Sequence, residues 1–205
     1  MSEASPKLNI KVLKHVESTQ LFYPASARDY LAPIEMFAPH VKDFWFADIA
    51  YFGQDDMLGD APVLSLDQGY KLLDLRVNDK IVPDEQWKDD PKYLHGPPCV
   101  RTEEYSYLDS KQRIQIHFYR RRGCTALRRD IDRLGVFFYR RDSNEGGSGT
   151  LWFPNHVNDI FEKLIDGGLI VTDGSNCCHN TYAPLRRFRG ESIGARARRN
   201  GSSIY

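Results

Sequence analysis

The stretch LFYPASARDYLAPIEMFAPHVKDFWFADIAYF, residues 21–52, decides the fold class that the sequence predicts. It begins with a short apolar run that stops at Pro24, and a turn of small residues, 25–27, follows. Apolar residues then recur at the spacing of one helix face, at Ile34, Phe37, Ala38 and Val41. A second apolar run, residues 44–47, ends at Asp48. Strand, turn, helix and a strand that ends in a carboxylate together form the βαβ unit of a nucleotide-binding half.

Two acids of this unit have a functional and a structural interpretation. Asp48 follows the turn by about 20 residues, where such units hold a ribose hydroxyl. Aspartate also commonly ends a strand in solvent, which is the alternative. Asp29 and its neighbour Arg28 could contact a ligand or pair with each other. For Asp29 we favour the cap of the following helix, because aspartate is preferred at that position.

The size and composition indicate one folded domain, residues 1–205. Hydrophobic residues make up 41% and aromatic residues 12% of the chain, as in ordinary soluble proteins. No apolar run approaches the roughly 18 residues of a membrane helix. The start, MSEASPKLNIKVLKH, lacks the apolar centre of a signal peptide. We therefore expect a cytoplasmic protein that does not enter a membrane.

The net charge is zero, but acids and bases are segregated. Residues 53–92 hold ten acids and five bases, whereas residues 111–141 hold ten bases and two acids. The last 26 residues add six arginines and one acid. Such asymmetry can indicate a polyanionic partner. Neutralisation of one region by another within the fold is the simpler interpretation, and we favour it.

Residues 53–98 and 182–205 interrupt the regular pattern. The first segment is acidic and rich in proline and glycine, with one expected element at Tyr70–Val77. We interpret it as an insertion, and insertions at such positions commonly cover a site. The second segment is rich in glycine, serine and arginine, and we expect an edge element or a loose tail there.

The second half of the chain alternates between strands and helices. Residues 100–108 and 113–119 predict two strands joined by a turn at 109–110. A helix is expected over 125–134, and the apolar run 135–139 predicts a buried strand. A second helix should begin near Pro154, bury Leu164 and Ile165 on its inner face and end at Gly167–Gly168. The next strand is expected at 169–171.

These patterns predict an α/β fold, with a mostly parallel Rossmann-like sheet and helices on both faces, an irregular insertion and an antiparallel strand at one edge. The expected central strands are residues 21–23, 44–47, 114–119, 136–139 and 169–171. Right-handed crossovers bring the loops after parallel strands to one edge of the sheet. We therefore expect a crevice where loops 24–29, 48–53, 140–149 and 173–179 converge, with Asp48 and Asp142 facing it.

The order of elements resembles the class I S-adenosylmethionine-dependent methyltransferases. LFYPASARD resembles the family's first strand and cofactor loop, FWFAD its second strand, and the segment from GVFFY to LIVTDGS its fourth and fifth strands. The resemblance implies that S-adenosylmethionine is the cofactor. It also implies that the cofactor's amino-acid part lies on the first of these segments and its ribose on Asp48. The residues that it assigns to the loop are Tyr23, Ala25, Ser26 and Arg28.

The chain departs from this family at two places. The family's loop is rich in glycine, whereas residues 24–28 contain none. A side chain at a position of positive φ costs on the order of 1–2 kcal/mol. The sequence therefore predicts weak cofactor affinity unless residues 26–29 adopt the backbone path that glycine normally provides. The Asn/Asp-Pro-Pro-aromatic signature of amino-group methylation is also absent, and residues 141–143 stand in its place.

The segment after the strand at 135–139 supplies the remaining candidates. Gly146 and Gly147 could wrap a phosphate or carboxylate with backbone N–H groups, although a flexible connector has the same composition. Asp142 and Glu145 are the best placed general bases, if the protein is an enzyme. A small-molecule ligand is therefore the expected partner.

Two further patterns have weaker interpretations. The sequence Asn-Cys-Cys-His at 176–179 lacks the C-x-x-C spacing of zinc sites, so we expect no metal. The arginine clusters with nearby aromatic residues could bind nucleic acid or a protein partner. A catalytically silent binding module that uses this arginine-rich face is the alternative function.

Overall fold

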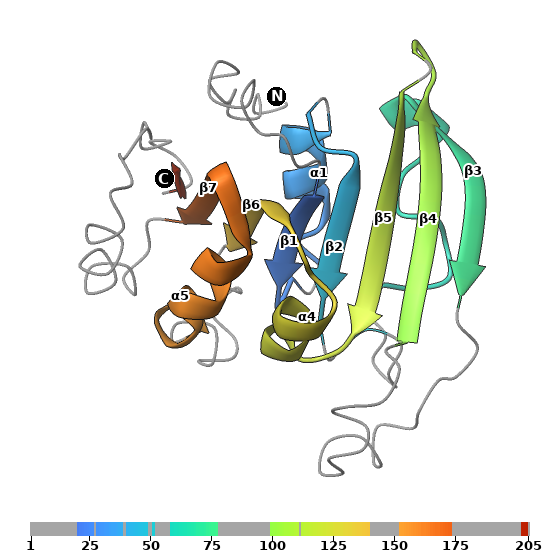
Figure 1. Cartoon of the computed structure of the whole chain (residues 1–205). Helices are drawn as coiled ribbons and strands as arrows, with labels where there is room; N and C mark the ends of the chain where they lie inside the picture. The colour runs from blue at the N-terminus through green and yellow to red at the C-terminus, as the bar shows by residue number, and fades with distance from the viewer. Residues whose placement is uncertain are drawn as a thin grey trace.

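The computed structural model of the protein describes residues 20–26, 28–38, 40–48, 51, 58–77, 99–110, 112–139, 152–173 and 202–204. These residues form one sheet of eight strands in the order β3-β4-β5-β2-β1-β6-β7-β8 (Figure 1). The strands are β1 (Gln20–Pro24), β2 (Asp43–Ala47), β3 (Tyr70–Val77), β4 (Cys99–Tyr107), β5 (Arg113–Arg120), β6 (Leu134–Tyr139), β7 (Leu164–Asp173) and β8 (Ser202–Ile204).

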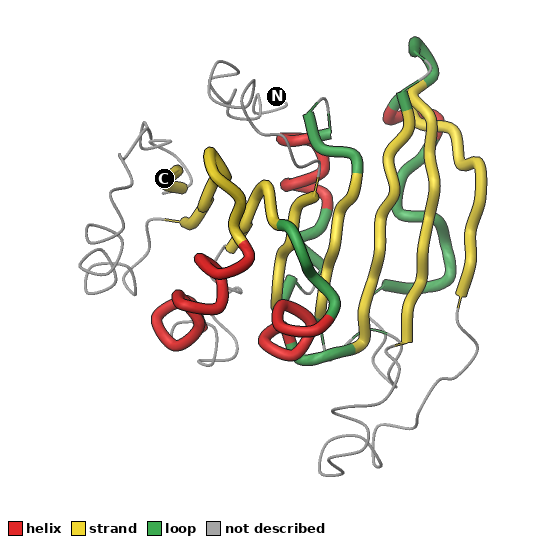
Figure 2. The backbone as a smooth tube through the Cα atoms, viewed as in Figure 1, coloured by secondary structure: helices red, strands yellow, loops and turns green. Residues whose placement is uncertain are grey.

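The sheet is mixed. The pairs β5–β2, β2–β1, β1–β6 and β6–β7 are parallel. The pairs β3–β4, β4–β5 and β7–β8 are antiparallel. Figure 2 shows β4 and β5 as long neighbouring strands joined by a short turn.

Three short α-helices accompany the sheet in the part of the chain that the structure describes. They are α1 (Leu31–Phe37), α4 (Gly123–Arg129) and α5 (Trp152–Lys163), with a 3₁₀ turn, η2 (Leu66–Gln68), before β3. In Figure 1, α4 and α5 lie on the near side of the β1, β6 and β7 region, and α1 lies on the far side. None of the described helices is both long and apolar enough to span a membrane.

The predicted fold class is wrong. Three of the seven strand pairings are antiparallel, and the described helices are only 7, 7 and 12 residues long. The protein is therefore not a helix-flanked, mostly parallel Rossmann-like sheet. The physical reason is the connection from β2 to β5, which passes through the antiparallel strands β3 and β4. The turn expected at 109–110 indicated the antiparallel β4–β5 pair, which is confirmed. Apolar runs do not indicate pairing direction, so the second antiparallel pair, β3–β4, was not predicted.

The strands themselves follow the apolar runs. The five runs predicted as strands, at 21–23, 44–47, 114–119, 136–139 and 169–171, each lie within a strand of the sheet. The element expected inside the insertion is strand β3, Tyr70–Val77. Buried apolar runs bounded by turn residues are thus sufficient to locate strands in this chain.

Two predicted helices have different ends. The helix expected over 125–134 ends at Arg129, and Leu134 already belongs to β6. The second helix ends at Lys163 rather than at the glycine pair, and β7 begins at Leu164. Gly168 is therefore not a helix cap. A Cβ there would lie 2.7 Å from the Leu164 side chain, so close packing excludes a larger residue.

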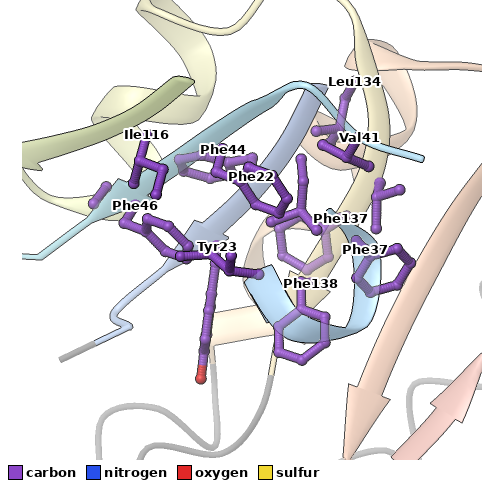
Figure 3. Packing of buried hydrophobic residues seen from close by; sticks show 14 of the residues in the cluster. Phe22, Tyr23, Phe37, Val41, Phe44, Phe46, Ile116, Leu134, Phe137 and Phe138 are labelled. Carbon is purple, nitrogen blue, oxygen red and sulfur yellow. The ribbon is translucent and has the colours of Figure 1, made fainter. Parts of the chain in front are cut away.

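The core on the far face of the sheet fixes where α1 lies. Phe138 of β6 packs against Tyr23 of β1 and Phe37 of α1, with ring centroids 5.0 and 6.1 Å apart (Figure 3). Tyr30, just before α1, meets Phe118 of β5 at 5.4 Å. All of these aromatic contacts are tilted or edge-to-face, the geometry that aromatic pairs prefer. They hold the loop between β1 and α1 against the sheet.

A buried ion pair fastens residues 58–65 to β4. Arg101 donates hydrogen bonds to the carbonyl oxygens of Gly59 and Ala61, both at 2.6 Å, and its Nη2 lies 2.5 Å from Glu103 Oε1. Glu103 Oε2 accepts hydrogen bonds from the Val63 amide at 3.0 Å and from the Tyr105 hydroxyl. The Nη2–Oε1 contact is an ion contact rather than an aligned hydrogen bond. Both charged side chains are almost completely buried.

Candidate functional site

The carboxyl ends of β1 and β2 lie side by side. Pro24 is opposite Ala47 in the parallel pair, and the Ala25 amide donates to the Ala47 carbonyl at 2.7 Å. The Asp48 amide donates to the Tyr119 carbonyl at 3.0 Å, which continues the sheet on the β5 side. On its other side, β1 pairs with β6, so the strand order reverses at β1. Ligands of open sheets bind at the carboxyl ends of strands at such a reversal.

The loop after β1 turns sharply. Ala25 has φ 51°, a left-handed backbone conformation that residues other than glycine rarely adopt. The Asp29 amide then donates to the Ser26 carbonyl at 2.8 Å and closes a turn. The loop therefore takes a left-handed step without a glycine, one residue before the segment 26–29 in which it was expected.

Five polar side chains gather at these strand ends, and we call them the β1–β2 cluster: Tyr23, Ser26, Asp29, Asp48 and Tyr51. The Ser26 and Tyr51 hydroxyl oxygens are 2.6 Å apart and buried. The Tyr23 hydroxyl donates to Asp29 Oδ2 at 3.0 Å. Tyr51 is also held by the ring of Phe118, with ring centroids 5.5 Å apart. Residues 25 positions apart in the sequence thus meet in one hydrogen-bonded group.

The electrostatics of the cluster centre on Tyr51. Burial raises the pKa of Tyr51 well above its ordinary value, and the hydrogen bond from Ser26 opposes this only in part. The carboxylates of Asp48 and Asp29 raise this pKa further, as does Tyr30. The phenol therefore stays protonated at neutral pH.

This arrangement suits particular ligand groups. Half-buried carboxylates accept hydrogen bonds from hydroxyls and bind ammonium groups. The exposed guanidinium of Arg28, in the same loop, could bind a carboxylate. The cluster can therefore bind a molecule that combines hydroxyl groups with a positive charge.

Five of the predicted site residues lie in these two loops or at the end of β1, but not all of them have side chains suited to a ligand. Ser26, Arg28 and Asp48 surround the strand ends. Tyr23 is buried and reaches the site only through its hydroxyl, and Ala25 contributes the left-handed turn. The other predicted residues, Asp142, Glu145, Gly146 and Gly147, lie outside the described residues, as do Cys177, Cys178 and His179.

The sequence prediction for two members of the cluster was incomplete. Asp29 is not the helix cap, because the cap position of α1 is Tyr30 and no side chain binds there. The Asp29 carboxylate instead accepts a hydrogen bond from the Tyr23 hydroxyl. Tyr51 was missed because a single tyrosine inside the run IAYF resembles a core residue. The only signal for Tyr51 was its position three residues after Asp48.

Three arginines of the basic segment 111–141 form ion pairs within the fold. Arg113 pairs with Glu104 at 3.0 Å, and Arg121 with Asp130 at 2.9 Å. Arg128 pairs with Asp159 at 2.8 Å. None of these three acids belongs to the acidic segment 53–92, so neutralisation of one segment by the other stays a prediction. No group of three or more potential metal ligands occurs among the described residues.

The left-handed residue gives a direct test of the loop. We expect Ala25→Gly to raise the free energy of unfolding by about 0.5–1 kcal/mol. The left-handed conformation costs alanine about 1–2 kcal/mol, and glycine returns about 0.4–1 kcal/mol of this as unfolded-state entropy. Urea denaturation of both proteins measures the difference. Ala126→Gly in α4 is the control and should lower stability by about 1 kcal/mol or more. A less stable Ala25→Gly variant would contradict the left-handed turn.

Comparison with known proteins adds no functional assignment, because no protein-family model, no curated protein and no solved structure matched the chain.

Proposed function

We propose that the protein binds a nucleoside-type small molecule at the carboxyl ends of β1 and β2, and that S-adenosylmethionine is the first candidate. The observation that carries this proposal is the position of Asp29 in the loop after β1 and of Asp48 directly after β2, at adjacent strand ends beside the strand-order reversal at β1. The proposal does not depend on the fold class. It rests on the local geometry of two adjacent strand ends.

The chemistry of the ligand matches the side chains. A ribose diol donates two hydrogen bonds, which a carboxylate such as Asp48 accepts. Asp29 accepts a hydrogen bond from the Tyr23 hydroxyl, and its negative charge suits an ammonium group. Arg28 suits the carboxylate at the same end of S-adenosylmethionine. The ammonium and the carboxylate of the ligand therefore each have a side chain of opposite charge in the loop after β1.

The loop conformation supports binding despite the absence of glycine. Ala25 adopts the left-handed conformation that glycine provides in the family's loop. What can still weaken affinity is the bulk of the side chains in residues 26–29, as the sequence predicts.

Methyl transfer is the activity that we propose for the bound cofactor. Asp142 and Glu145, which follow β6 in the sequence, are the candidate general bases for it. Binding can be tested independently of this step.

Calorimetric titration with S-adenosylmethionine tests the proposal. We expect saturable one-to-one binding, and Asp48→Ala should weaken it at least about tenfold. Loss of a hydrogen bond to a charged group costs about 1.5–3 kcal/mol, and 1.4 kcal/mol corresponds to a tenfold change in affinity. Asp67→Ala, which removes an exposed acid in η2, is the matched control and should bind as the wild type does.

Two further ligands sharpen the experiment. Adenosine should retain the Asp48 effect, because it keeps the ribose. Methionine should lose that effect and depend instead on Arg28. The proposal is wrong if no nucleoside binds, or if Asp48→Ala and Asp67→Ala have the same affinity.

A further inference from the structure

Strand β3 forms one edge of the described sheet (Figure 1). It carries exposed apolar side chains. It pairs with β4 on one side only. Its leucines and valine are 36–41% exposed, namely Leu72, Leu73, Leu75 and Val77. Natural proteins rarely leave a long apolar edge strand uncovered, because its free N–H and C=O groups pair readily with another strand.

A β-bulge orders these side chains. Leu72 is opposite Tyr105 and Asp74 is opposite Glu104, so Leu73 is an extra residue in β3. Beyond the bulge the strand is regular. Leu75 then shares a face with Leu72, while Asp74 lies on the other face. The bulge thus converts the run KLLDLRV into one apolar and one charged face.

The charges on β3 are placed symmetrically about Leu75. Asp74 and Arg76 flank it on the charged face, with 2.5 Å between Arg76 Nε and Asp74 Oδ2. Both are accessible, with side-chain exposures of 41% and 76%. An exposed pair of this kind contributes little to the stability of one chain. It is, however, available to a second strand.

We propose that β3 pairs with β3 of a second copy of this chain, in an antiparallel arrangement centred on Leu75. A two-fold axis perpendicular to the sheet makes each face continuous across the two copies, so residues opposite each other must share a face. The regular part of β3 offers axes through Asp74, Leu75 or Arg76. The choice among them is decided by charge.

Only the central axis of these three is electrostatically complementary. An axis through Asp74 places the Asp74 side chains of the two copies opposite each other. An axis through Arg76 places the two Arg76 side chains opposite each other. Like charges directly opposite are destabilising. The axis through Leu75 places Leu75 opposite its own copy and Asp74 opposite Arg76 of the partner subunit. The same pairing then occurs twice, once on each side of the axis.

The pairing of one short strand buries less area than a standard stable interface. The dimer should therefore be weak and depend on protein concentration. The charge pairs set its register, and the apolar face supplies burial. The area of this contact thus predicts a reversible equilibrium rather than an obligate dimer.

Sedimentation equilibrium of the full chain over a range of concentrations tests the proposal. We expect a monomer–dimer equilibrium that Asp74→Arg or Arg76→Asp each weakens about tenfold, because each variant creates two like-charge pairs. The combined variant Asp74→Arg/Arg76→Asp should restore the wild-type dissociation constant, since it exchanges the two charges. Leu75→Lys should abolish the dimer.

Leu108→Lys is the matched control, because Leu108 is an exposed leucine (52%) that lies outside β3. It should leave the equilibrium unchanged. Circular dichroism confirms that each variant is folded. A protein that stays monomeric at every concentration would overturn the proposal. That result is expected if a segment of the same chain, rather than a second copy, covers β3. A dimer that the combined charge exchange does not restore would also overturn it, as would one that survives Leu75→Lys.

Discussion

Glu103→Ala is expected to lower the free energy of unfolding by about 3–5 kcal/mol, the range for breaking a buried ion pair by removal of one partner. Arg101 and Glu103 are both almost completely buried. Removal of the carboxylate leaves the guanidinium with only the carbonyl oxygens of Gly59 and Ala61. It also removes the acceptor of the Val63 amide and of the Tyr105 hydroxyl. Residues 58–65 would then lose much of their attachment to β4.

Urea unfolding measures the change, and hydrogen exchange of residues 58–65 localises it. The double variant Arg101→Met/Glu103→Leu is the control for charge. It should be more stable than Glu103→Ala, because it leaves no buried unpaired charge. A loss below about 1 kcal/mol in Glu103→Ala would show that water reaches the pair in solution, and would contradict its structural role.

His117 is expected to make the protein less stable in mild acid. Its ring stacks on Trp45 with centroids 4.1 Å apart, and its Nδ1 lies 3.0 Å from Thr102 Oγ1. Burial lowers the pKa of His117 from 6.5 to about 4. Between these two values the unfolded chain binds a proton that the folded chain excludes. Stability therefore falls as the pH decreases through this window.

The difference between the two pKa values corresponds to about 3 kcal/mol, at 1.36 kcal/mol for each pKa unit. Urea unfolding of the wild type and of His117→Gln at several pH values isolates this contribution, because the other titrating groups cancel in the comparison. We expect the advantage of the wild type over the variant to shrink by about this amount from pH 7 to pH 4. Parallel stability curves would show that His117 binds its proton as readily in the folded state as in the unfolded chain, and would contradict the lowered pKa.

The sequence located the strands because each central strand is a buried apolar run. An element of unspecified type was expected at the bounds of β3, whose alternation is broken by the bulge at Leu73. Pairing direction is different, because it depends on contacts between distant segments. The short turn expected at 109–110 implied antiparallel pairing of residues 100–108 with 113–119, and β4 and β5 do pair in this way. No local pattern showed that β3 would add a second antiparallel pair at the edge of the sheet. That is why the fold class was wrong while the strands were right.

The strand ends of the candidate site could be predicted, but its hydrogen bonds could not. A carboxylate at the end of a strand is a local pattern, and Asp48 shows it. The contact between Ser26 and Tyr51 joins two loops, and it exists only because β1 and β2 are neighbours. Asp29 shows the same limit. A helix-start pattern predicted a cap, whereas the tertiary structure brings the Tyr23 hydroxyl to its carboxylate.

Strand β5 has consequences for how the chain folds. On one side it pairs with β4 across the short turn at 108–112, and on the other it pairs with β2, where Gln115 is opposite Asp43. A hairpin closes in about 1–10 μs, whereas joining distant segments requires the closure of a long loop. We therefore expect β4 and β5 to associate first and to dock onto β2 as a unit. The rate-limiting step would then be formation of the β2–β5 contact. There the hairpin, which forms quickly from neighbouring residues, must join parallel strands that are distant in the sequence.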